Sequence, residues 1–229
     1  MLKIKLFHFN PLEACCAVLS LESSSSCLIC DPGMYDESER EALLSLLEKE
    51  GLTPEAILLT HGHFDHIFGA AFLQKKYGIP VFMHPSDKKT VRLSPAFAEY
   101  FSSRVLDASF VTTDISDGEI LSLSGLEIKV IATPGHTPGG VCYYIGSEGV
   151  LLSGDTLFAG SIGRSDLPGG DYDLLIRSVL DRLMVLPPET DVIPGHGPAT
   201  TIGHESGTNP FLLPFNEPDD SPWWNSPAE

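Results

Sequence analysis

The pattern of apolar and polar residues predicts that the chain begins with three short β-strands. The two kinds of residue alternate over the first segment, which suits a strand, and two further apolar runs follow it. A serine run at 23–26 lies between those runs and is typical of a hairpin turn. The expected strands are Leu2–Phe7, Ala14–Ser20 and Cys27–Cys30.

The pattern then changes to helical spacing. Leucines recur on one face of the segment that follows, and Asp36 with Glu39 three residues later resembles a capping box. In that motif each side chain bonds to the backbone N–H of the other residue. Gly51 is a natural end for the helix. The sequence therefore predicts a helix at Glu37–Glu50.

A strand–helix–strand unit is predicted next. The run EAILLT (55–60) is typical of a buried strand, FGAAFLQKKYG (68–78) of a helix that ends at glycine, and PVFMH (80–84) of a further strand. This order suits a βαβ unit, in which the two strands are parallel. Later in the chain we expect a helix at Asp173–Leu186 and strands at Glu119–Leu123, Leu126–Ala132, Val141–Ile145, Val150–Leu152 and Asp191–Gly195.

Two segments carry weaker patterns. Residues 86–110 are irregular apart from a short helix expected at Ser94–Ser103, and they could cross a pocket as a lid or simply connect the halves. The connector interpretation is preferred. The whole pattern predicts an α/β fold of mixed sheets covered by helices, in a single domain at 1–215. Residues 216–229 form an acidic, proline-rich tail, where Trp223 and Trp224 could dock on the body or on a partner.

The charge balance limits the expected partners. The 229-residue chain has 14 lysines and arginines against 31 aspartates and glutamates, a formal net charge of −17. Nucleic acids and anionic membrane surfaces are bound largely through basic residues, so we expect neither as a partner. A small-molecule substrate is compatible with this charge. The chain is expected to be a monomer or a small homo-oligomer.

Two further features bear on location. No apolar run approaches the ~20 residues of a membrane span, and the N-terminus lacks the pattern of a secretory signal. The five cysteines, an odd number, indicate free thiols in a reducing compartment. A cytoplasmic location is therefore expected. Cys27 and Cys30 match the C-x-x-C spacing, but residues three apart on a strand face opposite sides, so two strand residues are preferred over a redox or zinc pair.

Residues that commonly bind metals cluster directly after the run EAILLT. His61, His63, Asp65 and His66 fall within six positions, and histidine and carboxylate are usual zinc ligands. Gly62 lets the backbone turn tightly between the first two. One short loop cannot complete two tetrahedral sites, so further ligands are expected elsewhere in the chain.

Three more candidates follow predicted strands. His136 lies in TPGHTPGG, Asp155 in LLSGDTLF and His196 in VIPGHGPAT, each beside a glycine. This shared context makes convergence at one edge of a sheet the expected arrangement. The alternative, that these are ordinary surface residues, requires a coincidence across four glycine-marked loops.

Together, HGHFDH, TPGHTPG, SGDTLF and PGHGP, with a leading DPG, resemble the metallo-β-lactamase superfamily over about residues 10–212. The resemblance implies an αββα sandwich, in which two mixed sheets pack face to face with helices outside. It also implies two divalent metal ions, zinc foremost, with iron or manganese as alternatives. By the same resemblance, one ion would be held by His61, His63 and His136, the second by Asp65, His66 and His196, and both by a bridging Asp155.

The chemistry implied by the resemblance is hydrolysis by a metal-bound hydroxide. Two ions share a water, lower its pKa towards ~7 and polarise the carbonyl group that the hydroxide attacks. Asp65 is the candidate catalytic residue, because it could orient this nucleophile as well as bind metal. Asp31 of DPG either orients a ligand histidine or is a structural turn residue, and both interpretations stay open.

The stretch LFAGSIGRSDLPGGDY (157–172) resembles the small glyoxalase-II-like hydrolases. The first hypothesis is therefore hydrolysis of a thioester such as S-lactoylglutathione, or of a related small ester. The Gly-Arg-Ser-Asp pattern also resembles the persulfide dioxygenases, which use a single iron, and a third hypothesis is a non-catalytic metal-binding protein on the same scaffold. Arg164 is a candidate substrate anchor, or else an ion-pair partner of Asp166.

Overall fold

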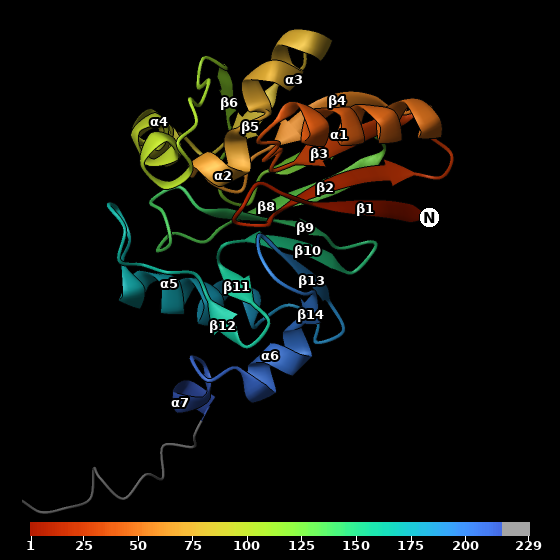
Figure 1. Cartoon of the computed structure of the whole chain (residues 1–229). Coiled ribbons are helices and arrows are strands. Elements are labelled where there is room, and N and C mark those ends of the chain that lie inside the picture. The colour runs from red at the N-terminus through yellow and green to blue at the C-terminus, as the bar shows by residue number, and fades with distance from the viewer. Residues whose placement is uncertain (217–229) are drawn as a thin grey trace, which may run out of the picture.

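The computed structural model describes residues 1–216 and contains two mixed β-sheets (Figure 1). The first sheet is antiparallel over its first three strands and parallel over the rest. Its strands lie in chain order: β1 (Leu2–Phe9), β2 (Ala14–Leu21), β3 (Ser26–Cys30), β4 (Thr53–Leu58), β5 (Val81–Met83) and β6 (Thr112–Asp114).

The second sheet is antiparallel apart from one parallel pair, β10 with β13. Its order is β14 (Thr200–Thr201), β13 (Asp191–Pro194), β10 (Val150–Gly154), β9 (Val141–Ile145), β8 (Leu126–Ala132) and β7 (Ile120–Leu123). A separate hairpin consists of β11 (Leu157–Phe158) and β12 (Ser161–Ile162).

Helices cover the outer faces of both sheets (Figure 1). On the first sheet and at its edge lie α1 (Glu37–Glu50), α2 (Phe64–Ile67), α3 (Ala70–Tyr77), the 3₁₀ turn η1 (Pro85–Asp87) and α4 (Lys88–Ser102). The second sheet is followed by α5 (Tyr172–Ser178), the π-type turn η2 (Val179–Leu183), α6 (Ile202–Thr208) and α7 (Leu213–Asn216). No helix in the described range is long and apolar enough to cross a membrane.

Three apolar clusters hold these layers together. One packs Leu43 of α1 and Leu73 of α3 against the first sheet, and another packs Leu58 against Tyr143 between the two sheets. The third lies between the second sheet and the helices that begin at α5. Burial of this apolar surface is the main force that keeps the layers in place. The predicted αββα sandwich is confirmed.

The two sheets are also joined by hydrogen bonds at the edge where the candidate ligands gather. The phenol of Tyr143, fully buried in β9, donates to the carbonyl of Leu59 just past β4 (2.8 Å). The N–H of Val141 donates to the carbonyl of Thr60 (2.9 Å). These bonds fix the loop after β4 against the second sheet, directly before His61.

The structure differs from the predicted elements in several places. The helix expected at Ser94–Ser103 is α4, which begins six residues earlier at Lys88, because the helix continues through Pro95. The capping box at α1 is only half formed: Asp36 accepts the N–H of Glu39 (3.0 Å), but the Glu39 carboxylate bonds to the N–H groups of Asn10 and Tyr35. The sequence did not indicate α2 or β6.

The cysteines have the arrangement expected of strand residues. Cys27 packs in the cluster on the outer face of the first sheet, and Cys30 packs in the cluster between the sheets, so the two thiols lie on opposite faces. All five cysteines are free and buried. Apart from Asn216, the predicted tail at 216–229, with Trp223 and Trp224, falls outside the described residues.

Candidate metal centre

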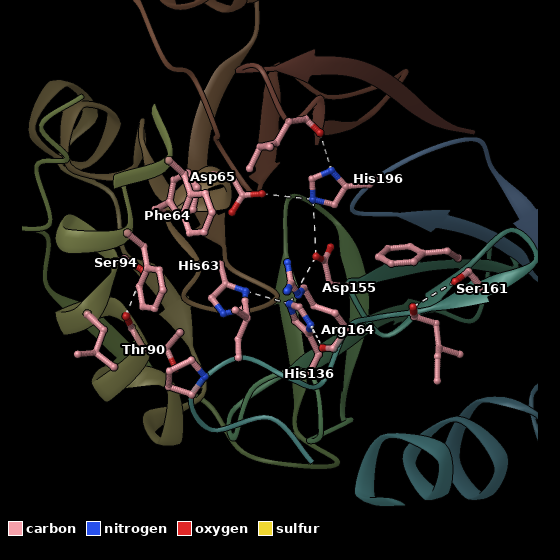
Figure 2. Close-up of a pocket in the computed structure, with 18 residues that line it drawn as sticks. His63, Phe64, Asp65, Thr90, Ser94, His136, Asp155, Ser161, Arg164 and His196 are labelled. Atoms are coloured by element: carbon pink, nitrogen blue, oxygen red, sulfur yellow. Dashed lines mark hydrogen bonds and ion pairs between the residues drawn. The ribbon is translucent and has the colours of Figure 1, made fainter. Parts of the chain in front are cut away.

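The seven candidate ligands converge at one edge of the two sheets. Five of them border a cavity, namely His63, Asp65, His136, Asp155 and His196 (Figure 2). The loop after β4 carries His61 and His63, and the short helix α2 follows at once and carries the buried Asp65 and His66. The other three residues follow strands of the second sheet, namely His136 after β8, Asp155 after β10 and His196 after β13. The predicted convergence is therefore what the structure has.

The first group of donors consists of His61, His63 and His136. One nitrogen of each lies within 4.8 Å of the others in the group. Nδ1 of His63 and Nε2 of His136 are only 2.9 Å apart, although these residues are 73 positions apart in the chain. Two imidazole nitrogens at this distance either share a proton or direct their lone pairs at a common cation.

The second group consists of Asp65, His66 and His196. Nε2 of His66 lies 3.2 Å from Nε2 of His196. Oδ2 of Asp65 lies 3.3 Å from the same nitrogen of His196 and 3.6 Å from that of His66. A carboxylate and two imidazoles form a donor set that suits a divalent transition metal.

Asp155 lies between the two groups. Its Oδ2 is 3.4 Å from Nε2 of His136 in the first group and 3.6 Å from Nε2 of His196 in the second. Its Oδ1 is 3.4 Å from Nε2 of His66. The one carboxylate therefore faces histidines of both groups, which is the position of a bridging ligand.

The outward-facing histidine nitrogens have oxygen partners. Nδ1 of His136 lies 2.7 Å from the carbonyl of Arg164, and Nδ1 of His196 lies 2.9 Å from the carbonyl of Leu12. A carbonyl oxygen accepts only, so each of these nitrogens carries its proton and donates. The lone pair of each ring is then on Nε2, which faces the centre, as in metal-binding histidines.

Asp31 orients two further rings. It accepts hydrogen bonds from the backbone N–H and the hydroxyl of Thr60, at 2.8 and 2.6 Å, and its Oδ2 lies 3.1 Å from Nδ1 of His66. Because the Thr60 hydroxyl donates to Asp31, its oxygen is free to accept from Nδ1 of His61 at 3.0 Å. Asp31 also belongs to a third donor group with both histidines. Its oxygens are already engaged by these donors, so it contacts the histidines from outside the centre.

The donor atoms have the arrangement that a bound cation requires. Nε2 of His61 and Oδ1 of Asp155 are buried and have no hydrogen-bond partner. A buried polar atom without a partner costs free energy, and a metal ion removes that cost. Ligand atoms ~2.0–2.1 Å from a tetrahedral zinc lie roughly 3.3 Å from one another. The separations of 3.2, 3.3 and 3.6 Å in the second group agree with that spacing, and the 2.9 Å between His63 and His136 in the first group is slightly shorter.

The charges in the centre favour a cation. Burial lowers the pKa of His61 well below its usual value and that of His63 to about 3, so both rings are neutral and keep a lone pair. At His66 burial acts in the same direction, but the carboxylates of Asp155 and Asp65 outweigh it and raise the pKa to about 10. The carboxylates thus stabilise positive charge at the place where the donors meet.

Arg164 pairs with Asp166 on the surface and also borders the cavity. Two parallel hydrogen bonds of 2.8 Å join the guanidinium and the carboxylate, and the pair holds the pKa of Asp166 at about 2. The ion pair that the sequence offered as one interpretation is therefore present. The backbone carbonyl of Arg164 orients His136, a role that no side-chain motif could reveal.

Asp87 is a buried residue of the site that sequence reasoning missed. Its carboxylate accepts the N–H of Gly62 (2.7 Å), between the first two candidate ligands, and the N–H of Gly139 (2.7 Å) in the loop of His136. The hydroxyls of Thr137 and Thr90 also donate to it. Burial raises the pKa of Asp87, and these four donors offset part of that increase. Asp87 thereby ties together two ligand-bearing loops.

The cavity beside the donors has a volume of about 460 Å³. One side is formed by α2 and α4, where Figure 2 shows Phe64, Thr90 and Ser94, and the other by the β11–β12 hairpin with Ser161 and the segment with Arg164. The segment 86–110 thus does border the pocket, as a packed helix. The preferred interpretation of it as a simple connector was incomplete.

Comparison with known proteins gives consistent matches. The family model described as Metallo-beta-lactamase superfamily matches residues 16–196. Hydroxyacylglutathione hydrolase GloC of Haemophilus influenzae is 34% identical over 213 residues, which cover 92% of this chain and 98% of that protein.

Two solved structures are similar over nearly their whole length. The crystal structure of BLEG-1 B3 metallo-beta-lactamase has a TM-score of 0.84 and 39% identity, covering 92% of this chain and 99% of that one. The crystal structure of TTHA1623 in a di-iron-bound form has a TM-score of 0.81 and 39% identity, covering 91% of this chain and 100% of that one.

Proposed function

This chain belongs to the metallo-β-lactamase superfamily, and from that premise we propose that it is a two-metal hydrolase. Its substrate would be a thioester such as S-lactoylglutathione, or a related small ester. The observation that carries the proposal is the set of inward-facing donors. They form two groups joined by Asp155, and His61 Nε2 and Asp155 Oδ1 are buried without a hydrogen-bond partner. The similarity to a hydroxyacylglutathione hydrolase supports the thioester class.

In the proposed centre, the residues around the ligands orient the histidine rings. Asp31 with Thr60 sets the tautomers and orientations of two histidines, and the carbonyls of Leu12 and Arg164 do so for two others. The ligands of one ion would be His61, His63 and His136, those of the second Asp65, His66 and His196, with Asp155 shared.

When bound, two divalent ions supply a water of lowered pKa, towards ~7, and a Lewis acid for the carbonyl oxygen. Asp65 borders the cavity as well as the second group, so its carboxylate can accept a hydrogen bond from the attacking water and orient it. The histidines beside it are held in fixed positions, which keeps the geometry of attack constant from one turnover to the next.

Zinc is the first candidate metal, with iron and manganese as alternatives, because nitrogen and oxygen donors accept all three. The di-iron form of the similar structure supports two ions and makes iron a serious alternative. A single-iron persulfide dioxygenase would need only His61, His136 and Asp155. The complete second group therefore favours the two-metal hydrolase.

A β-lactam is the second candidate substrate, favoured by the similarity to BLEG-1. Its amide carbonyl is attacked by the same type of nucleophile as a thioester carbonyl. The two candidates are separated by assaying one preparation with S-lactoylglutathione and with a chromogenic cephalosporin.

The test combines metal analysis with these assays. We expect about two metal ions per chain and release of glutathione from S-lactoylglutathione. His63→Ala should lose metal and activity, whereas His8→Ala, a matched change at an exposed histidine of β1, should keep both. Unchanged metal content in His63→Ala would refute the ligand assignment. One iron per chain with oxygen uptake on glutathione persulfide would overturn the hydrolase proposal.

A further inference from the structure

The cavity has a polar floor and apolar walls (Figure 2). The floor consists of candidate ligands, and the walls come from segments that lie on opposite sides of it. A volume of about 460 Å³ is in the range of small-molecule sites and is larger than a lactoyl group needs. We call the part of the substrate that is attached to the reacting carbonyl group its arm. The walls of the cavity, not the floor, therefore decide which arm is bound.

One wall is a row of aromatic rings on α2 and α4. The rings of Phe64 and Phe101 are 6.2 Å apart and inclined by 1°, and those of Phe97 and Phe101 are 6.2 Å apart and inclined by 8°. Phe101 is 57% exposed, so a large part of an aromatic ring at the mouth of the cavity remains available for contact. Aromatic faces in this arrangement bind apolar groups well.

This wall is bonded directly to the loop that carries His61 and His63. The hydroxyl of Ser94, buried on α4, donates to the carbonyl of Gly62 at 2.7 Å. Gly62 lies between His61 and His63, so the aromatic row has a fixed position relative to the first donor group. An apolar arm held on the row would present its carbonyl to the floor in a defined orientation.

The opposite wall is also apolar and is held from behind. Phe158 and Ile162 of the β11–β12 hairpin line it. Glu205, fully buried on α6, accepts the N–H of Gly160 at the tip of that hairpin (2.8 Å), and Asn209 donates to the carbonyl of Ser161 (3.0 Å). The cavity is thus a slot between two supported apolar surfaces.

Charge in the cavity does not favour an anionic arm. Among its described lining residues, Arg164 is the one lysine or arginine, and Asp166 neutralises it through two hydrogen bonds. Glutathione carries two carboxylates, and these would find no uncompensated arginine or lysine along the described walls.

We propose that the preferred substrate is an ester or thioester with an apolar arm, aliphatic or aromatic, seated between the aromatic row and the hairpin. The arm carries no anionic group. This inference rests on the proposed hydrolase function and narrows its substrate class. It places the binding energy on Phe64, Phe97 and Phe101 and not on recognition of glutathione.

The test uses a series of thioesters that share one uncharged thiol, N-acetylcysteamine, and differ in acyl length: acetyl, butanoyl, hexanoyl and octanoyl. Each buried methylene should raise kcat/KM up to ~4-fold, so hexanoyl should exceed acetyl by at least ~10-fold. S-hexanoylglutathione, with the same arm and a charged thiol, should be no better than the N-acetylcysteamine ester. Thiol release reports all of these reactions.

A pair of variants locates the effect on the row. Phe101→Ala should reduce the hexanoyl-to-acetyl ratio at least ~5-fold, because the arm loses much of one ring. Phe215→Ala is the matched control, since Phe215 is 55% exposed and lies on α7, away from the cavity lining. It should leave the ratio unchanged. In calorimetric titration, N-butylhexanamide should bind more weakly to Phe101→Ala than to the wild type, and equally well to Phe215→Ala and the wild type.

The outcomes separate the inference from the function on which it rests. Metal-dependent hydrolysis with a flat acyl series, or a ~10-fold preference for the glutathione ester, would overturn the apolar arm and leave the hydrolase in place. An unchanged ratio in Phe101→Ala would overturn the role of the row. No hydrolysis of any ester by metal-loaded protein would overturn the hydrolase itself, and the inference with it.

Discussion

Replacing Asp87 with asparagine tests whether a buried carboxylate outside the donor groups holds the metal centre together. The change keeps the shape of the side chain and removes one acceptor. Each carboxylate oxygen of Asp87 accepts one backbone N–H, from Gly62 or from Gly139, both at 2.7 Å. Asparagine has one oxygen and one NH₂ group, so one of these N–H groups must face another donor.

The expected loss of stability follows from one N–H group without an acceptor and one weakened hydrogen bond. A buried N–H left without an acceptor costs about 1–3 kcal/mol, and loss of the charge on the remaining bond adds about 1 kcal/mol. We therefore expect Asp87→Asn to lower the free energy of unfolding by about 3 kcal/mol. For a chain of this size that corresponds to a fall in Tm of roughly 6–12 °C.

The same change should weaken metal binding. Gly62 separates His61 from His63, and Gly139 belongs to the loop of His136, so the two loops lose a shared anchor. Outer partners of metal ligands typically contribute about 10–100-fold to affinity. Thermal unfolding with and without metal, and competition with a chromophoric chelator, measure the two effects. Asp107→Asn, at an exposed site, is the control.

The reasoning would be refuted by a variant that matches the wild type in both measurements. A Tm within about 2 °C of the wild-type value would show that the backbone donors find other acceptors. A lower Tm with unchanged metal affinity would show that Asp87 stabilises the fold without positioning the ligands.

Two further predictions concern glycine and cysteine. A Cβ at Gly195 would collide with Oδ1 of Asp155, so Gly195→Ala should lose metal by elemental analysis, whereas Gly207→Ala, with open space around it, should not. Burial raises the pKa of the Cys15 and Cys27 thiols to about 12. Below that pH the unreactive thiol form dominates, so iodoacetamide should label both cysteines slowly at pH 8 in folded protein and fast in urea. Rapid labelling of the folded protein would contradict the assigned burial.

The candidate ligands could be predicted because their signal is local. His61 and His63 stand in one short run after an apolar strand, and the later candidates each stand beside glycine at a strand end. Strand ends on the same edge of a sheet meet in space, so the pattern carries three-dimensional information. The alternation of apolar residues likewise predicted most strands, since each face of a strand packs on a different layer.

What the sequence did not reveal depends on distant contacts. Asp87 stands in an ordinary PSD run, and its role comes from two loops that are 25 and 52 residues away. The length of α4 was underestimated because proline is common in the first turn of a helix and rare in its interior, so the helix was expected to begin beside Pro95. Here Val91 and Ala98 on either side of Pro95 are buried and hold the helix in place. Glu39 accepts the N–H of Tyr35, one residue before the one that the capping box uses, and that of the distant Asn10, which no capping rule includes.

The division of the donors between the two halves of the chain has a consequence for biosynthesis. The ribosome releases the loop with His61 and His63 long before the residues that complete each group, since His136 lies 73 positions after His63 and His196 lies 130 after His66. An ion captured by the nascent chain would have only part of its ligands. Binding of both proposed ions would therefore require the finished polypeptide, and a product that stops before His196 would complete only the first triad.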